Sequence, residues 1–336
     1  MSPDDETAFR NWYRAWSVAL GDGRTDPPLW TIEELRVQYL DDDPARALDR
    51  EAYVAVADGE VLGTGVLELP RRDNPRFAEV EVTVPPRYRR RGVGTALFAA
   101  VLDRATELGR DSLAAAVAQP VDAPRVPGVD FAGAMGFTWR NTDMRRRLDL
   151  PVDPAVLDAL ERESAPHHVG YRLVSWRDRC PDQYAAGYAD LKSRLMTDAP
   201  TGTLEYEPEV WDVARLRAEE ELTARQDRTV LTTVALDGTG DPVGHTQLAV
   251  PHHGTGEVFQ WDTLVLPEHR GHRLGVALKV ANQRVLASEF PDRRCIETWN
   301  AVQNGPMNAV NEALGFRSLE ELQSWQRDPG PSAQPW

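Results

Sequence analysis

The sequence predicts a mixed α/β (α+β) fold made of two copies of one unit, each with a mixed sheet flanked by helices. One observation is the length of 336 residues, which is enough for two domains that each bury a core. The other is that the order of predicted elements repeats after roughly 180 residues, too long a period for a solenoid.

The composition excludes several classes of protein. The chain has 38 basic and 53 acidic residues, a net charge of −15, which argues against nucleic-acid and anionic-membrane partners. With 41% hydrophobic residues it is neither disordered nor collagen-like. No segment approaches the roughly 18 apolar residues of a membrane span, and the start lacks signal-peptide features. The two cysteines, Cys180 and Cys295, fit a reducing compartment, so we expect a cytoplasmic protein.

The first copy is predicted from hydrophobic periodicity and turn signals. A hairpin is centred on Asp58-Gly59, which lies between two alternating apolar segments. In chain order, the predicted elements are helices at 6–20 and 31–48, the hairpin at 53–69, a strand at 78–84, a helix after a basic loop, a strand at 112–117 and a short helix ending at 137.

The second copy repeats this order after a proline-bounded segment that has the character of a linker. We therefore expect an N-terminal domain at 1–149, a linker at 150–169 and a C-terminal domain at 170–336. The predicted elements of the second copy are a strand at 171–176, helices at 183–197 and 208–225, a hairpin at 229–250, a strand at 258–265, a helix after the loop, a strand at 295–300 and a helix ending at 316.

Both copies place a basic, glycine-containing loop between a strand and a helix. In the first copy the strand ends at Val84, and the loop continues as Arg89, Arg90, Arg91, Gly92, Val93, Gly94 and Thr95. A helix N-terminus offers unpaired N–H groups, glycines allow close approach, and arginines bind phosphate oxygens. The loop therefore predicts a pyrophosphate site. The dinucleotide fingerprint and the triphosphatase loop both require other spacings. A solvated arginine turn is the alternative, which the second copy disfavours.

The second loop differs from the first at one glycine position. It comprises Val265, Arg270, Gly271, His272, Arg273, Leu274 and Gly275. Arg273 stands where the first loop has Gly92, which puts close backbone approach in doubt there, although Arg273 could itself hold a phosphate. We interpret this loop as a working variant.

These motifs resemble those of the GNAT superfamily of N-acetyltransferases. The pattern Arg89-x-x-Gly92-x-Gly94 is similar to the family's acyl-CoA pyrophosphate loop, and the helix ends at Gly136-Phe137 and Gly315-Phe316 resemble its last conserved motif. The layout is similar to that of mycothiol synthase and other actinobacterial tandem GNAT enzymes. The resemblance implies two tandem GNAT acyl-CoA N-acyltransferase folds, with acetyl-CoA as cosubstrate.

The same resemblance implies direct transfer of an acetyl group from the CoA thioester to a neutral amine. A carboxylate or bound water removes the proton of the amine. Backbone N–H groups of the strand before the loop polarise the thioester carbonyl. An acid, commonly a tyrosine of the last motif, protonates the departing thiolate.

Candidate catalytic residues are richer in the second half. Asp262 lies on the strand before the loop, and alternation predicts that it shares a face with Gln260, opposite Trp261, Thr263 and Val265. Asp262 is the candidate base, with a purely structural aspartate as the alternative.

Three further residues complete the second-half candidates. His245, on the neighbouring hairpin strand, is a second candidate base, although a lone strand histidine is more often structural. By resemblance, Asn304 contacts the pantetheine arm, and Asn311 stands where the family's tyrosine acid would be. Protonation of the thiolate is left unassigned.

The first half carries Glu79 and Glu81 at the strand positions of Gln260 and Asp262. Its last motif is poorer, because Arg125 and Ala132 replace the expected asparagine and tyrosine. We therefore expect chemistry in the second half and a non-catalytic first half that can still bind acyl-CoA.

The acceptor is expected to be a small cationic amine. Segment 198–221 has eight acidic residues and two arginines, which would concentrate cations, although a solvated helix face gives the same pattern. No metal is expected, because His252-His253 lacks further ligands at suitable spacing. The alternatives are a catalytically inactive acyl-CoA-binding sensor or scaffold, and a protein N-acetyltransferase.

Overall fold

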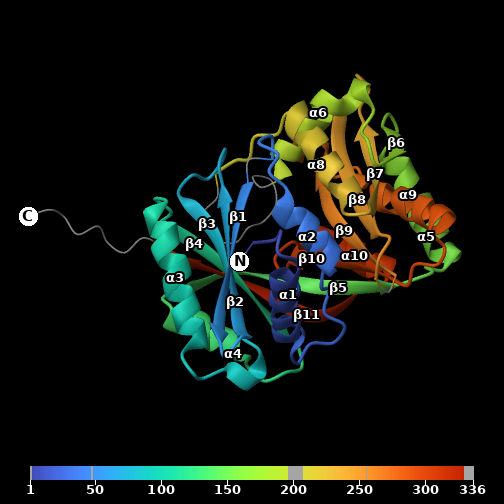
Figure 1. The fold of residues 1–336 in the computed structure, drawn as a ribbon. Coiled ribbons are helices and arrows are strands. Elements are labelled where there is room, and N and C mark those ends of the chain that lie inside the picture. The colour runs from blue at the N-terminus through green and yellow to red at the C-terminus, as the bar shows by residue number, and fades with distance from the viewer. Residues whose placement is uncertain (1, 47, 196–206, 255, 329–336) are drawn as a thin grey trace, which may run out of the picture. The chain divides into compact units, whose positions relative to one another are not determined.

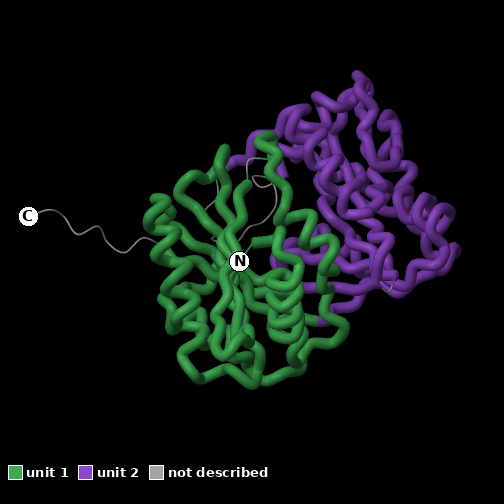
Figure 2. Tube along the Cα trace, viewed as in Figure 1, with its two compact units in different colours: residues 1–143, 202–207, 320–336 green, residues 144–201, 208–319 purple. Residues whose placement is uncertain are grey.

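The computed structural model describes residues 2–46, 48–195, 207–254 and 256–328, and confirms the mixed α/β fold. The chain forms two compact units (Figure 2). Unit 1 contains residues 1–143, 202–207 and 320–336, and unit 2 contains residues 144–201 and 208–319.

Unit 1 begins with two capped helices. Asp5 caps the first, and Thr31 with Glu34 forms a capping box at the second. The elements begun in this half of the chain are α1 (Glu6–Gly21), α2 (Ile32–Leu40), β1 (Leu48–Ala57), β2 (Glu60–Pro70), β3 (Phe77–Thr83), a 3-10 turn (Pro86–Tyr88), α3 (Val93–Glu107), β4 (Ser112–Pro120), α4 (Pro127–Ala134) and β5 (Thr138–Asp149).

The helix predicted at 31–48 is wrong at its C-terminal end. The helix α2 stops at Leu40 because Asp41 adopts an extended conformation, and Pro44 follows within the next turn. Strand β1 already begins at Leu48.

Unit 2 repeats the pattern after a helix in the predicted linker. The elements in this half of the chain are α5 (Pro154–Ser164), a 3-10 turn (Ala165–His167), β6 (Arg172–Arg177), α6 (Asp182–Ser193), α8 (Val213–Arg225), β7 (Arg228–Leu236), β8 (Pro242–Pro251), β9 (Glu257–Val265), a 3-10 turn (Pro267–His269), α9 (Leu274–Glu289), β10 (Cys295–Ala301), α10 (Gly305–Leu314) and β11 (Arg317–Arg327).

Helices cover both faces of the sheet in each unit (Figure 1). In unit 1 an aromatic cluster of α1 and α2, including Trp12 and Trp16, packs on one face, and α3 packs on the other face through Phe98. In unit 2 the helices α6 and α8 pack around Tyr188 on one face, while α9 packs around Val280 on the other. Each unit therefore has a pair of helices opposite the helix that follows its basic loop.

Two parallel strands separate early in each unit. In unit 1, β3 and β4 are paired only over residues 77–79 and 112–114. In unit 2, β9 and β10 are paired only over residues 257–259 and 295–297. Beyond these pairs, neither β3 nor β9 is paired with its parallel neighbour among the described residues, so the later backbone N–H groups on that side have no ladder partner.

Two strands that the sequence did not predict complete the sheets. Strand β11 pairs antiparallel with β4, from Glu320 opposite Pro120 to Arg327 opposite Leu113, and so closes unit 1. The C-terminal part of β5, from residue 144 onward, lies beside β10 and closes unit 2. Each unit therefore receives its last strand from the other half of the sequence.

A buried ionic cluster holds β5 to β10. The Glu297 carboxylate is fully buried and accepts hydrogen bonds from Nε of Arg145 at 3.0 Å and Nε of Arg147 at 2.5 Å. Arg145 is itself 0% exposed. Burial of these charges is tolerated because each has an opposite partner at hydrogen-bond distance.

Replacing Glu297 by leucine should destabilise unit 2 strongly, because two guanidinium groups would lose their buried carboxylate. We expect the free energy of unfolding to fall by about 3–5 kcal/mol, measured by urea denaturation of the full chain. The control is Glu6→Ala, which removes the exposed pair of Glu6 with Arg10 and should cost under about 1 kcal/mol. Equal losses in the two variants would contradict this role of Glu297.

Candidate functional site

The basic loop of unit 1 is anchored to the end of its strand. Arg89 donates from Nε to the carbonyl of Val84 at 2.9 Å and pairs with Asp22 at 2.7 Å. Arg90 and Gly92 have left-handed backbones, with φ of 60° and 82°. Gly92 caps α3, and no atom lies within 4 Å of the position that a Cβ would take there. The helix N-terminus is thus open to a ligand.

The loop of unit 2 has the same backbone geometry, but its glycine and arginine occupy the two left-handed positions in the opposite order. Arg270 donates from Nε to the carbonyl of Val265 at 3.1 Å, as Arg89 does in unit 1. Gly271 and Arg273 take the two left-handed positions, with φ of 85° and 52°. Arg273 thus adopts the conformation that Gly92 has, so the loop keeps its shape despite the substitution.

The two loops differ in how their basic groups are engaged. In unit 2, Arg273 pairs with Glu163 of α5, and Nδ1 of His272 lies 3.1 Å from the carbonyl of His167. In unit 1, Arg90 and Arg91 are exposed and form no ion pair with the residues that the structure describes. A phosphate group would therefore meet free guanidinium groups in unit 1 and a competing carboxylate in unit 2.

The remaining predicted loop residues begin the following helices. Gly94 is needed for packing, since a Cβ there would lie 3.3 Å from the Phe131 ring. Val93 is half-buried and Thr95 is exposed. In unit 2, Leu274 is the first residue of α9 and is buried in a core cluster with Ala235 and Val243, whereas Gly275 has free space around it.

Strand β9 contains a bulge that overturns one prediction. Thr246 of β8 is opposite Thr263 but Leu248 is opposite Gln260, so Trp261 and Asp262 both face one residue. Gln260 donates to Thr246 Oγ1 at 3.0 Å, and that hydroxyl lies 2.8 Å from Thr263 Oγ1. Gln260 thus shares a face with Thr263, and the predicted shared face of Gln260 and Asp262 is wrong because the inserted residue reverses the alternation.

Asp262 points to the face covered by α6 and α8, where it is paired with a lysine. Lys192 Nζ lies 3.0 Å from Asp262 Oδ2 and 3.2 Å from Gln247 Oε1. Burial raises the pKa of Asp262, but Lys192 and His245 outweigh burial and hold it below its ordinary value. In this state Asp262 is ionised and its charge is engaged by Lys192.

His245 lies beside this pair and is fully buried. Burial, followed by the charge of Lys192, lowers the pKa of His245 to about 3, so the ring is neutral at pH 7. Its Nδ1 lies 3.3 Å from the hydroxyl of Tyr188. The structure therefore brings His245 and Asp262 together, as their neighbouring strands predicted.

Asn304 and Asn311 lie apart from that cluster, on α10. Asn304 caps the helix by accepting from the N–H of Met307 at 3.3 Å. Asn311 is fully buried, accepts from Lys279 Nζ at 2.8 Å and donates to Asn300 at 2.5 Å. Burial lowers the pKa of Lys279 to about 7.

The strongest base candidate by environment is Glu81 of unit 1. Its Oε1 accepts a hydrogen bond from Trp16 Nε1 at 2.7 Å. Burial raises the pKa of Glu81 to about 7, and the nearby Glu68 adds to the rise. Glu81 lies on the predicted strand, but the tryptophan that covers it comes from α1, and no local sequence pattern indicates this contact.

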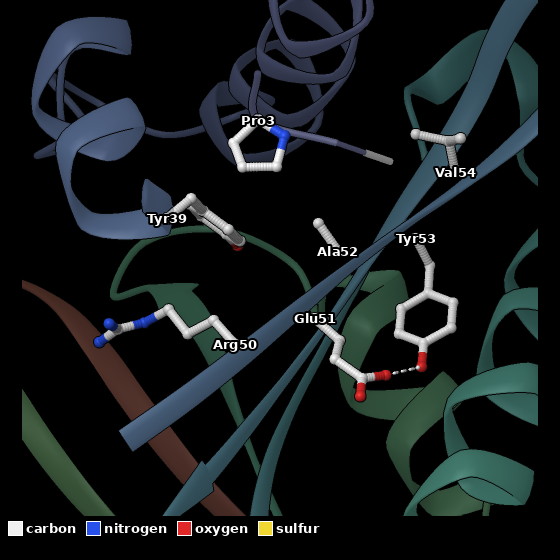
Figure 3. A pocket seen from close by; sticks show the side chains of 7 residues that line it. All are labelled: Pro3, Tyr39, Arg50, Glu51, Ala52, Tyr53 and Val54. Carbon is white, nitrogen blue, oxygen red and sulfur yellow. Dashed lines mark hydrogen bonds between the residues drawn. The ribbon is translucent and has the colours of Figure 1, made fainter. Parts of the chain in front are cut away.

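A pocket of about 490 Å³ opens at the edge of the same unit (Figure 3). Ala52 in its wall is opposite Val66, and Val66 is opposite Glu81, so all three lie in one row on one face of the sheet. The pocket is lined by Pro3, Tyr39, Arg50, Glu51, Ala52, Tyr53 and Val54. In Figure 3, Glu51 and Tyr53 are joined by a hydrogen bond of 2.6 Å.

The acid-rich segment offers less free charge than its composition indicated. Residues 198–206 lie outside the described residues. Beyond them, Asp212 caps α8, Glu220 pairs with Arg217 at 2.7 Å, and Glu209 pairs with Arg215 at 3.4 Å. In the described chain no group of three potential ligands could hold a metal ion, and no helix has the length and apolar character of a membrane span.

Comparisons with known proteins agree with the fold. Residues 9–137 match the model of the acetyltransferase (GNAT) family. A tandem GNAT protein from the clavulanic acid biosynthesis pathway is 28% identical, with a TM-score of 0.78 over 99% of this chain and 98% of its own. No curated protein sequence matches the chain.

Two further solved structures show the fold alone. One is a GCN5-related N-acetyltransferase from Sphaerobacter thermophilus, 15% identical, with a TM-score of 0.63 over 98% of this chain and 94% of its own. The other is a glucosamine N-acetyltransferase region of a fungal multi-domain GH3 beta-N-acetylglucosaminidase, also 15% identical, with a TM-score of 0.68 over 97% of this chain and 37% of its own.

The raised pKa of Glu81 should make stability depend on pH. The folded carboxyl, with a pKa of about 7, binds a proton more tightly than the unfolded one, whose ordinary value is 4.5. Stability from this group is therefore lost as pH rises from about 4.5 to 7. Glu81→Gln should remove that loss, on the order of 2 kcal/mol, in denaturation curves at pH 5 and 8. An unchanged pH dependence in the variant would contradict the assignment.

Proposed function

We propose that this protein is an acyl-CoA-dependent N-acyltransferase. Residues 9–137 match the GNAT family, and the whole chain has a tandem GNAT fold. The acceptor is the amine of a small cationic molecule. Acetyl-CoA is the default donor. Among the described residues nothing points to a larger acyl group.

The observation that carries this proposal is the environment of Glu81. A general base works best when its pKa lies near the operating pH, and burial gives Glu81 a pKa of about 7. Glu81 also lies two residues beyond the last β3–β4 pair and three before Val84, which anchors the loop. The end of the β3–β4 pairing, the proposed base and the residue that anchors the phosphate loop therefore follow one another along one segment of the chain.

The cofactor site of unit 1 fits a pyrophosphate. Arg90 and Arg91 are exposed, and the open N-terminus of α3 offers backbone N–H groups. Backbone N–H groups of β3 beyond its last pair with β4 could donate to the thioester carbonyl. Glu81 would take the proton of the attacking amine, and fixing both reactants in one unit would supply much of the rate.

Charge on the same face supports a cationic acceptor. Register places Arg50 opposite Glu68, and Glu68 opposite Glu79, in the row next to that of Glu81. Three carboxyl groups thus accompany one arginine, and the arginine is paired with Glu68 at 2.6 Å. A cation would be attracted to this face.

We therefore place catalysis in unit 1, although the sequence predicted it in the second half of the chain. Two observations argue for the change. Asp262 is already paired with Lys192 and is therefore not free to accept a proton from an added amine, and Arg273 must leave its pair with Glu163 before it can bind a phosphate. Asp262, His245 and Asn311 therefore stand as candidates for a separate role in unit 2.

Glu81→Gln should lower kcat by about 10²–10³, because the base is lost while the hydrogen bond from Trp16 can persist. The measurement is CoA thiol release with acetyl-CoA and a panel of small amines. The wild-type rate should rise with pH through an apparent pKa near 7, and the variant should lack that limb. Glu107→Gln, an exposed change on α3, is the control.

Full activity of Glu81→Gln would place the chemistry elsewhere. Binding of acetyl-CoA without turnover of any small amine would favour the acyl-CoA-binding module. Turnover only with peptide amines would favour a protein N-acetyltransferase.

The double substitution of Arg90 and Arg91 by alanine should weaken acetyl-CoA binding by about 10–100-fold, since a hydrogen bond to a charged group contributes about 1.5–3 kcal/mol. Isothermal titration of the full chain measures this loss. Arg10→Ala, on the exposed face of α1, is the charge control. Unchanged affinity in the double variant would place the cofactor away from this loop.

A further inference from the structure

Lysine is rare in this chain and is confined to buried sites of unit 2. Only two of the 38 basic residues are lysines, Lys192 and Lys279. They are 9% and 1% exposed. Lysine differs from arginine in one chemical respect that matters here: its amine can lose a proton and attack a carbonyl carbon, which a guanidinium does not do.

Lys192 holds its amine beside Asp262, the residue of unit 2 that occupies the position of Glu81 in unit 1. Asp262 lies three residues before Val265, as Glu81 lies three residues before Val84, and each strand has already separated from its parallel neighbour. Lys192 Nζ is 3.0 Å from Asp262 Oδ2. An amine of the chain itself therefore occupies, in unit 2, the place where unit 1 would receive its acceptor.

Three groups fix that amine in place. Gln247 Oε1 accepts from Nζ at 3.2 Å, and the Trp211 ring centroid lies 4.6 Å from Nζ. The Asp262 side chain is 29% exposed, so the pair can be reached from its carboxylate side. The loop at Arg273 keeps its geometry, and its exposed pair with Glu163 is weak enough for a pyrophosphate to displace.

We propose that Lys192 is an acyl-acceptor site of unit 2, at which the protein acetylates itself from acetyl-CoA. This inference rests on the proposed use of acyl-CoA by the chain. Asp262 takes a proton from the ammonium, and the freed Nζ attacks the thioester carbonyl carbon. The N–C bond forms, the C–S bond breaks, and CoA leaves as a thiolate that takes up the proton held by the carboxyl of Asp262. The nitrogen releases its second proton to solvent, so one proton is set free for each acetyl group transferred.

The product has a direct electrostatic consequence. Acetyl-lysine is neutral, so Asp262 loses its ion pair while the rest of the strand is unchanged. The carboxylate would then be free to bind another cation at the same place. Self-acetylation would thus convert a closed ion pair into an unpaired carboxylate.

Mass spectrometry of the full chain incubated with acetyl-CoA tests this proposal. We expect a gain of one acetyl group, and peptide mapping should place it on Lys192 and not on Lys279. Lys279 is the internal control, because it is also buried but contacts Asn311 instead of a carboxylate. Lys192→Arg should abolish the gain, and Asp262→Asn should slow it by about 100-fold or more.

Variants that fail to fold do not undermine the test, because the wild-type ratio of Lys192 to Lys279 acetylation is itself a result. No acetyl group on Lys192, or equal modification of both lysines in the folded chain, would overturn the proposal. So would an unchanged rate in a folded Asp262→Asn variant, since that would show spontaneous modification.

The two proposals can fail separately. Glu81→Gln should stop turnover of added amines while Lys192 is still acetylated. Arg270→Ala should do the reverse, slowing acetylation of Lys192 by removing the anchor of the second loop. If turnover proceeds in unit 1 and Lys192 stays unmodified, only the present inference is wrong.

Discussion

The site in each unit depends on the early separation of two parallel strands. In unit 1 the ladder between β3 and β4 ends after residue 79, and in unit 2 the ladder between β9 and β10 ends after residue 259. Main-chain donors beyond these points have no partner strand on one side, which is costly in a closed sheet but useful beside a ligand. Glu81 and Asp262 lie just past the separation, and these are the carboxyl groups to which we assign chemistry in our proposals.

The separation is possible because other strands carry the stability of each sheet. β11 closes unit 1 along β4 over eight residue pairs, and β5 closes unit 2 beside β10. The ion cluster of Glu297 with Arg145 and Arg147 fixes the latter contact. Because each closing strand comes from the opposite half of the sequence, neither half contains all the strands of its own sheet.

The two units have used one scaffold in different ways. Both loops have the same backbone shape, yet Arg90 and Arg91 of unit 1 are exposed, whereas Arg273 of unit 2 is engaged by Glu163. Burial without a cationic partner raises the pKa of Glu81, whereas Lys192 lowers that of Asp262. The hydrogen bond from Trp16 only partly offsets the effect of burial on Glu81, whereas Lys192 outweighs burial at Asp262, so Glu81 and not Asp262 has a pKa near 7.

The sequence by itself determined the repeated unit, the loops and most elements, because these depend on local periodicity and on glycine and arginine spacing. It missed β5 and β11. The sequence of β5, TWRNTDMRRRLD, is too charged to be recognised as a buried strand until Arg145 and Arg147 are seen to pair with Glu297. It also missed the bulge at Trp261 and Asp262, which only the register with β8 reveals. Tertiary structure alone decided the protonation of Glu81 and Asp262, because their partners are brought in by helices distant in the chain.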